Sequence, residues 1–193
     1  MDEHQRKVMF SKGNDEWETP QHIFDSLNEI YNFTQDVCAS PQGVICFEKD
    51  ENGNKIEVEY FTPSKCSKYF TIEDNALEQD WSGEVNFMNK PYSQAKAFIE
   101  KAYEDSRKEN TIVVSLCPVR TETKWFKIAW LYASNIFFYD KRIQFLKNGK
   151  TPGSAAFPSA VIEFDWRVNR CANGQFSYEY KVAYVFRMID ILD

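Results

Sequence analysis

The spacing of apolar residues predicts a helix near the start of the chain. Apolar side chains recur at helical spacing from Ile23 to Ile30. Thr19 and Pro20 come directly before them. Threonine is a good N-cap residue and proline suits the first turn, so Thr19 is expected to cap this helix with Pro20 in its first turn.

A β-rich region follows this predicted helix. A short strand is predicted over residues 33–38, ending in a turn. Two β-rich arms then flank a charged tip that contains Asn52-Gly53, a sequence typical of tight hairpin turns. We therefore predict a β-hairpin over residues 44–61 and a further strand near residues 68–70.

Strands and helices alternate in the second half of the chain. The predicted strands cover residues 84–88, 111–116, 135–139, 157–166 and 178–191, and the predicted helices cover 93–108 and 122–133. This alternation is typical of a mostly parallel sheet with helices on both faces, which binds ligands at the carboxyl ends of its strands. We expect one α/β domain over residues 15–193, after a mobile N-terminal tail at residues 1–14.

Composition narrows the range of functions. No apolar run is long enough to span a membrane, and the charged N-terminus is unlike a signal peptide. The five cysteines form no C-x-x-C pair, which disfavours a disulfide framework and a zinc site; no metal is expected. Only two histidines are present, too few for a histidine-based nuclease. These features favour a cytoplasmic protein.

Charge is unevenly distributed along the chain. The formal net charge is −6, but the window from Pro118 to Pro152 holds seven basic and two acidic residues. Its net charge of +5 leaves −11 for the remainder. Such a window is either a solvated basic face or a surface that faces DNA.

The stretch with the clearest chemistry is Asn86-Phe87-Met88-Asn89-Lys90-Pro91-Tyr92-Ser93. A strand here delivers a carboxamide, a proline turn and a tyrosine to the carboxyl edge of the sheet. This stretch resembles motif IV of amino-methyltransferases, which reads Asp, Asn or Ser, then Pro-Pro, then Tyr or Phe.

Several further blocks occur in the order of one family, the phage-type DNA N6-adenine methyltransferases, which the chain resembles over about residues 15–165. They are Trp17-Glu18-Thr19-Pro20-Gln21, Asp36-Val37-Cys38-Ala39-Ser40, Cys66-Ser67-Lys68-Tyr69-Phe70-Thr71, Glu73 to Trp81, Pro118 to Phe126, Arg142-Ile143-Gln144-Phe145 and Phe157 to Ile162. The resemblance implies a single-domain, Rossmann-like S-adenosylmethionine-dependent fold, with the 44–61 hairpin as an insertion.

The resemblance also implies a reaction. S-adenosylmethionine would methylate N6 of adenine in DNA after the base has flipped out of the duplex. The side-chain oxygen of Asn89 and the backbone carbonyl of Lys90 would accept the amine hydrogens. Pro91 shapes the turn, and Tyr92 would stack on the base, a contact worth about 1–3 kcal/mol.

Lys90 departs from the family pattern, which has proline at this position. Every residue has a carbonyl, so that acceptor is retained, but the rigidity of a fixed φ is lost. A lysine beside the target pocket would either hold a phosphate or repel the cationic sulfonium. In the second case the protein would be a lapsed catalyst that only binds cofactor or DNA.

The cofactor residues are likewise implied by the resemblance. They are Trp17, Thr19, Pro20, Asp36, Cys38, Ala39, Ser40, Asp74 and Asn75. Thr19 and Pro20 would meet the methionine end, and Asp74 and Asn75 the adenosine. Asp80 is a weaker candidate for the adenosine. Asp74 is equally suited to hold a turn or cap a helix.

DNA is the expected partner, with Arg120, Lys124 and Arg142 as candidate phosphate contacts. The hairpin is either decoration, a DNA-reading element or a self-association element, and both a monomer and a homodimer fit the sequence. Cytosine-N4 methylation is the neighbouring activity, because the same pocket serves both amines. A phage-encoded protein would work in the cytoplasm of its bacterial host.

Overall fold

The computed structural model describes residues 17–39, 42–49, 51–62, 64–146 and 157–171. The predicted tail at 1–14 and the predicted strand at 178–191 lie outside these residues. The helices of the described part are α2 (Gln21–Tyr31), η1 (Ala76–Glu78), η2 (Tyr92–Gln94), α3 (Ala95–Asp105), α4 (Lys124–Tyr132) and α5 (Trp166–Cys171). The strands are β1 (Gln35–Asp36), β2 (Gln42–Lys49), β3 (Lys55–Thr62), β4 (Lys68–Tyr69), β5 (Val85–Met88), β6 (Ile112–Pro118), β7 (Asn135–Phe138) and β8 (Ser159–Asp165).

Six strands form one sheet in the order β4-β1-β5-β6-β8-β7. The first four run parallel, and β8 is antiparallel to both of its neighbours, so β7 runs in the same direction as β6. The predicted mostly parallel sheet is confirmed, with β8 as its reversed strand.

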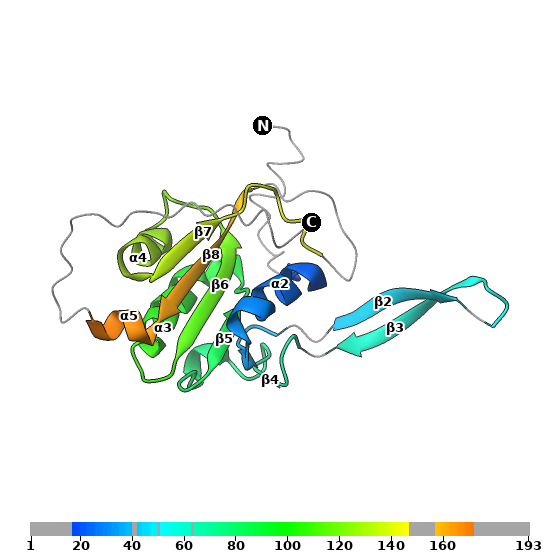
Figure 1. The fold of residues 1–193 in the computed structure, drawn as a ribbon, viewed down its shortest axis with the longest axis horizontal. Helices are drawn as coiled ribbons and strands as arrows, with labels where there is room; N and C mark the ends of the chain where they lie inside the picture. The colour runs from blue at the N-terminus through cyan, green and yellow to red at the C-terminus, as the bar shows by residue number, and fades with distance from the viewer. Residues whose placement is uncertain (1–16, 40–41, 50, 63, 147–156, 172–193) are drawn as a thin grey trace.

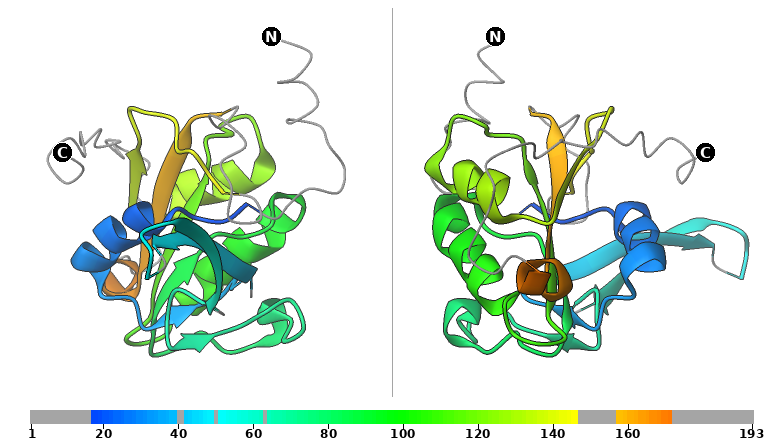
Figure 2. Two further views of the ribbon diagram at one scale, coloured as in Figure 1. Left: turned by 90° about the vertical axis from the view of Figure 1, so that its right-hand side faces the viewer. Right: turned by 60° about the vertical axis from the view of Figure 1, so that its left-hand side comes forward.

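Helices cover both faces of this sheet, α2 on one and α3 with α4 on the other (Figure 2). Side chains of one strand alternate between the two layers: on β6, Val113 and Cys117 pack on the α3–α4 side, whereas Val114 and Leu116 pack on the α2 side. We call these the α3–α4 face and the α2 face.

Strands β2 and β3 pair with each other in antiparallel register from Gln42↔Thr62 to Lys49↔Lys55, where the sequence predicts a hairpin. They form a separate two-stranded sheet that projects away from the main sheet (Figure 1).

The start of α2 differs from the sequence prediction. Pro20 is the N-cap, no side chain caps the helix, and the Thr19 hydroxyl instead accepts a hydrogen bond from Asn89. Ile30 is 50% exposed, so it does not belong to the core face of α2. The core side of α2 consists of Ile23, Phe24 and Leu27.

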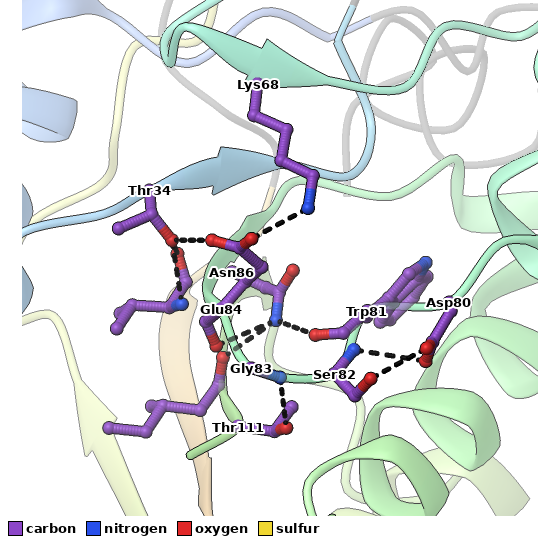
Figure 3. A network of polar contacts seen from close by, with 11 residues as sticks. Thr34, Lys68, Asp80, Trp81, Ser82, Gly83, Glu84, Asn86 and Thr111 are labelled. Atoms are coloured by element: carbon purple, nitrogen blue, oxygen red, sulfur yellow. Dashed lines mark hydrogen bonds and ion pairs between the residues drawn. The ribbon is translucent and has the colours of Figure 1, made fainter.

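A polar network secures the amino-terminal edge of the sheet, where β5 and β6 begin (Figure 3). The Asn86 carboxamide donates to the carbonyls of Trp81, Glu84 and Ile112 at 3.0–3.1 Å. Gly83 adopts a φ of +76°, which favours glycine, and its N–H donates to the Thr111 hydroxyl. These bonds fix the chain entering β5.

Candidate active site at the carboxyl edge of the sheet

The carboxyl ends of β1, β4, β5 and β6 meet at one edge of the sheet, because these strands are parallel neighbours. The chain after them supplies Cys38, Asp74, Asn89 and Arg120 in turn. Polar side chains from distant parts of the sequence therefore share the edge at which open α/β sheets bind ligands.

Two hydrogen bonds hold the side chain of Asn89 at this edge in one orientation. Its Nδ2 donates to the Trp17 carbonyl at 2.7 Å and to the Thr19 hydroxyl at 3.0 Å. A carbonyl oxygen can only accept, so the NH₂ group of Asn89 must face Trp17. No described residue donates to Oδ1 of Asn89, which leaves this acceptor available.

The segment that orients Asn89 is itself held in place. Glu18 and Leu146 exchange two backbone hydrogen bonds of 2.9 Å, which tie the segment before α2 to the chain after β7. Thr19 and Pro20 are buried. The Trp17–Pro20 block therefore supports the residue after β5, a relation that sequence distance does not reveal.

Lys90 points away from Asn89. Its side chain is 1% exposed, its Nζ donates to the Ser115 hydroxyl at 3.1 Å, and the amine lies 5.1 Å from the centre of the Trp125 ring. Burial lowers the pKa of Lys90. The expectation of a phosphate contact is wrong, because a buried amine on the α3–α4 face cannot reach a DNA phosphate. Repulsion of the sulfonium stays a prediction, since the amine interacts electrostatically with Cys38 after β1. The alternation of side chains along β5 continues past the end of the strand and turns Lys90 inward.

Tyr92 follows Pro91 at the start of η2 and faces aromatic neighbours. Its ring meets Phe157 edge-on at 5.5 Å. Phe157 also contacts Phe145, and the Arg120 guanidinium lies 6.0 Å from its ring centre. Phe157 was not among the predicted site residues, although its block marks it in the sequence.

Asp36 ends β1 and is buried. Its carboxylate accepts from the backbone N–H of Cys38 at 3.0 Å and from that of Lys65 at 3.4 Å. Burial raises the pKa of Asp36 to about 6, against the opposing effect of these hydrogen bonds and of the Lys65 charge.

Ala39 and Cys38 follow Asp36 at the carboxyl end of β1. Ala39 is buried and its N–H donates to the Phe70 carbonyl, which joins the chain after β1 to the chain after β4. Burial raises the pKa of the Cys38 thiol, and the Asp36 charge adds to this effect. Ser40 lies outside the described residues.

Two further charged residues near Asp36 were missed by the sequence reasoning. Glu18 has a buried Oε1 to which no described residue donates. Lys65 donates from Nζ to the Gln21 side chain at 2.7 Å, and burial lowers its pKa while Asp36, Asp25 and Glu18 raise it. Glu18 could have been found from its place in the Trp17–Pro20 block, whereas no sequence signal marks Lys65.

The adenosine candidates divide between the two edges of the sheet. Asp74 accepts from the N–H and the hydroxyl of Thr71, and these bonds lower its pKa, so one of its oxygens holds the turn after β4. Asn75 adopts a left-handed φ of 50° before η1. Asp80 accepts from Ser82 and Lys108 at the opposite, amino-terminal edge, which rules it out as a residue of this site.

The basic candidates follow strands that end at the same edge. Arg120 comes after β6 and forms a 3.8 Å ion pair with Glu122. Lys124 opens α4, and Arg142 follows β7; both are exposed. Lys147 and Lys150 lie outside the described residues.

Within the described ranges, no cluster of His, Cys, Asp or Glu could hold a metal ion, and no helix is long and apolar enough to cross a membrane.

Comparison with known proteins identifies the family of this chain. The model of the family described as DNA N-6-adenine-methyltransferase (Dam) matches residues 60–185, which include Asn89 to Tyr92 and Arg120. The DNA N-6-adenine-methyltransferase of Haemophilus phage HP1 (strain HP1c1) is 31% identical over 156 residues, covering 78% of this chain and 79% of the relative. The DNA N-6-adenine-methyltransferase of Escherichia phage T1 is 27% identical over 128 residues, covering 65% of this chain and 45% of the relative. The chain thus belongs to the DNA N-6-adenine-methyltransferase (Dam) family.

Proposed function

We propose that this protein transfers a methyl group from S-adenosylmethionine to N6 of adenine in DNA. The observation that carries the proposal is the orientation of Asn89. Trp17 and Thr19 hold its NH₂ group, so that Oδ1 is available as a hydrogen-bond acceptor at the carboxyl edge of the sheet. Membership of the Dam family supports the same reaction.

An acceptor is needed here because the N6 lone pair of adenine is delocalised into the ring and is a weak nucleophile. Oδ1 of Asn89 and the carbonyl of Lys90 take the two amine hydrogens and direct the lone pair at the methyl carbon. A bond forms between N6 and this carbon, the bond from carbon to sulfur breaks, and its electron pair stays on sulfur. The extra proton on N6 then leaves to solvent. A neutral carboxamide is no general base, so catalysis rests on alignment and on acceptors aimed at the developing positive charge.

The residues around β1 suit a cationic methyl donor. S-adenosylmethionine carries an ammonium and the sulfonium that supplies the methyl group. Glu18 has a buried carboxylate oxygen without a described donor, and Asp36 is a buried carboxyl group whose pKa is raised to about 6. A bound cation would satisfy the first and ionise the second. We assign Trp17, Thr19, Pro20, Cys38, Ala39 and Ser40 to the methionine end of S-adenosylmethionine, which carries the ammonium and the sulfonium. We assign Asp74 and Asn75 to its adenosine.

An adenine within a duplex cannot reach this edge, so the base must flip out. We propose that Tyr92, three residues after Asn89, stacks on the flipped base, and that Phe157 supports the Tyr92 ring from behind. Arg120, Lys124 and Arg142 are proposed to contact phosphates, which positions the duplex without reading its sequence.

The mixed α/β arrangement with its six-stranded sheet fits a methyltransferase-like fold. We propose that residues 15–193 form one Rossmann-like domain and that the 44–61 hairpin is an addition to it. The separate pairing of β2 with β3, outside the six-stranded sheet, supports the second part of this proposal.

The test is methyl transfer from labelled S-adenosylmethionine to unmethylated DNA, followed by digestion to nucleosides. N6-methyl-2′-deoxyadenosine is the expected product. Asn89→Ala should lower kcat at least ~100-fold, the loss typical of removing one transition-state hydrogen bond. Asn89→Asp keeps an acceptor oxygen, so it should retain more activity than the alanine variant.

Cofactor binding serves as the control, since Asn89→Ala should still bind S-adenosylmethionine. N4-methylcytosine as the product would replace the adenine assignment. If the wild-type protein binds S-adenosylmethionine and yields no methylated nucleoside, the proposed activity is wrong and the protein is a binder.

A further inference from the structure

Lys90 is the largest departure from expectation in the site. It is among the largest fully buried side chains of the described chain, although burial of a charged amine is costly. Its Nζ makes one described hydrogen bond, to Ser115 of β6, and faces the Trp125 ring of α4. The Lys90 side chain thus links the turn after β5 to β6 and α4, and we call this link the tether.

Few charged or polar groups surround the Lys90 amine within the described residues. The titratable groups that act on it are Cys38 after β1 and Cys117 on β6, and no carboxylate acts on it among the described residues. Ser115 and Trp125 are therefore its main polar partners, from β6 and α4 respectively. A cation over a tryptophan ring contributes more when it is desolvated, as it is here.

The tether acts on the two groups proposed to hold the adenine amine. The carbonyl of Lys90 belongs to the same residue as the anchored side chain, and the peptide bond to Asn89 is rigid. Trp17 and Thr19 hold Asn89 from the α2 face, while Ser115 and Trp125 hold Lys90 from the α3–α4 face. The turn is thus fixed from both sides of the sheet.

We propose that the Lys90 side chain is a positioning element: through Ser115 and Trp125 it holds the Asn89–Tyr92 turn so that the Asn89 side chain and the Lys90 carbonyl face the target amine. Its side-chain contacts restrict the backbone of this turn, as proline does at the same position of motif IV in amino-methyltransferases. This inference rests on the proposed function for its catalytic effect, but the tether itself is open to test without turnover.

The central variant is Lys90→Met, which keeps the length of the side chain and removes the amine. It should fold, since replacing a buried charge with a hydrophobic residue of similar volume is often neutral or stabilising. Its kcat should fall roughly 10- to 100-fold, because small misplacements of reacting groups carry such losses. The KM for DNA and the Kd for S-adenosylmethionine should stay within about twofold, as expected when only transition-state alignment is lost.

Lys101→Met is the matched control. Lys101 also lies over a tryptophan, 5.0 Å from the Trp81 ring, and pairs with Asp105, but it is on α3 and has no described contact with the turn. Its kcat should equal that of the wild type. A second comparison uses Ser115→Ala, which should lower kcat in the wild type and have no further effect in Lys90→Met, because Ser115 acts through Lys90.

Amide hydrogen exchange of the peptide covering residues 85–94 gives the second readout. Exchange should be faster in Lys90→Met than in the wild type and unchanged in Lys101→Met. Wild-type kcat in Lys90→Met, or wild-type exchange in this peptide, overturns the proposal. If the wild type shows no methyl transfer at all, the proposed function fails, and the exchange rates alone decide whether the tether exists.

Discussion

Asn86 and Asn89 lie three positions apart at opposite ends of β5, and their carboxamides serve different purposes. Asn86 is fully buried, and its NH₂ group joins three backbone carbonyls at the amino-terminal edge of the sheet. Asn89 uses its NH₂ group to fix its own orientation and presents its oxygen at the carboxyl edge. The strand therefore carries a stabilising amide at one end and a proposed catalytic amide at the other.

Replacing Asn86 separates these two contributions. Asn86→Leu removes the donor shared by the carbonyls of Trp81, Glu84 and Ile112, of which the Glu84 carbonyl still accepts from the N–H of Ile112. The free energy of unfolding should fall by about 2–3 kcal/mol, the cost of unsatisfied buried polar groups. Urea unfolding measures this loss. The kcat per folded molecule should not change, and a large fall in kcat without loss of stability would contradict this assignment.

Asp36 predicts how cofactor binding depends on pH. Its pKa is raised to about 6 by burial, so the free protein loses this negative charge as the pH falls through 6. If Asp36 binds the cationic donor, the affinity should be constant above about pH 7 and weaken by up to ~10-fold for each pH unit below 6. Calorimetric titration between pH 5 and 8 measures it. Asp36→Asn should bind more weakly at pH 8 and show a much flatter profile, and an unchanged profile in that variant would exclude Asp36 as the source.

The same shift has the opposite consequence for stability. A carboxyl whose folded pKa lies above its ordinary value of 3.8 favours the protonated folded state. Its contribution is fully present below pH 3.8 and is lost as the pH rises to about 6. Asp36→Asn should therefore unfold at a higher urea concentration than the wild type at pH 8, although it binds the donor less well. Such a residue sacrifices stability for binding.

The orientation of single side chains is where sequence reasoning was least successful. Lys90 was expected beside the pocket, because the turn that follows a strand is usually exposed. Its direction depends on the alternation of β5 continuing for two residues and on Ser115 of another strand, which no local pattern reveals. Lys65 was missed for the same reason: it becomes a neighbour of Asp36 and Glu18 only when the sheet and α2 are assembled.

At the scale of elements, periodicity predicted most of the described helices and strands. Alternating or continuous apolar runs marked β5, β6 and β8, and helical spacing marked α2, α3 and α4. The reversed direction of β8 was not predicted, because a buried strand has the same apolar pattern in parallel and antiparallel surroundings. The cap of α2 was wrong because Thr19 is engaged by Asn89, a tertiary contact that overrides a local preference.

The hairpin of β2 and β3 offers a test at this scale. Among the strands that the structure describes, β2 and β3 pair only with each other, and an isolated two-stranded hairpin is marginal in water. Replacing residues 44–60 with a short Gly-Ser turn should shift Tm by no more than about 2–4 °C, equivalent to about 1 kcal/mol for a chain of this length. The kcat and the KM for DNA should match the wild type if the hairpin is decoration.

Sedimentation of the shortened protein distinguishes the remaining roles of the hairpin. A lower oligomeric state than that of the wild type would show that the hairpin mediates self-association. A raised KM for DNA at unchanged kcat would show that it contacts DNA. Both results would replace the interpretation of the hairpin as decoration.

At the scale of the whole molecule, charge is segregated in a way that suits binding to DNA from one side. The net charge is −6, yet Arg120, Lys124 and Arg142 all follow strands that end at the edge where Asn89 lies. Outside the window from Pro118 to Pro152 the sequence carries a formal charge of −11, so this window is the part of the chain that favours a polyanion. DNA would thus be directed to the edge that holds the proposed catalytic residues.

This arrangement predicts the salt dependence of DNA binding. The double variant Lys124→Ala/Arg142→Ala should raise the Kd for DNA by a similar factor for all DNA sequences, because phosphate contacts carry no sequence information. The slope of log K against log salt should become less steep by about 0.9 for each phosphate that the protein no longer neutralises. The kcat at saturating DNA should be preserved, since neither residue holds the adenine amine.

The matched control is Lys108→Ala, which removes an exposed charge that pairs with Asp80 and Asp105 at the opposite edge. If Lys108→Ala lowers the slope as much as the double variant does, the effect comes from net charge, and the duplex is not bound at the carboxyl edge.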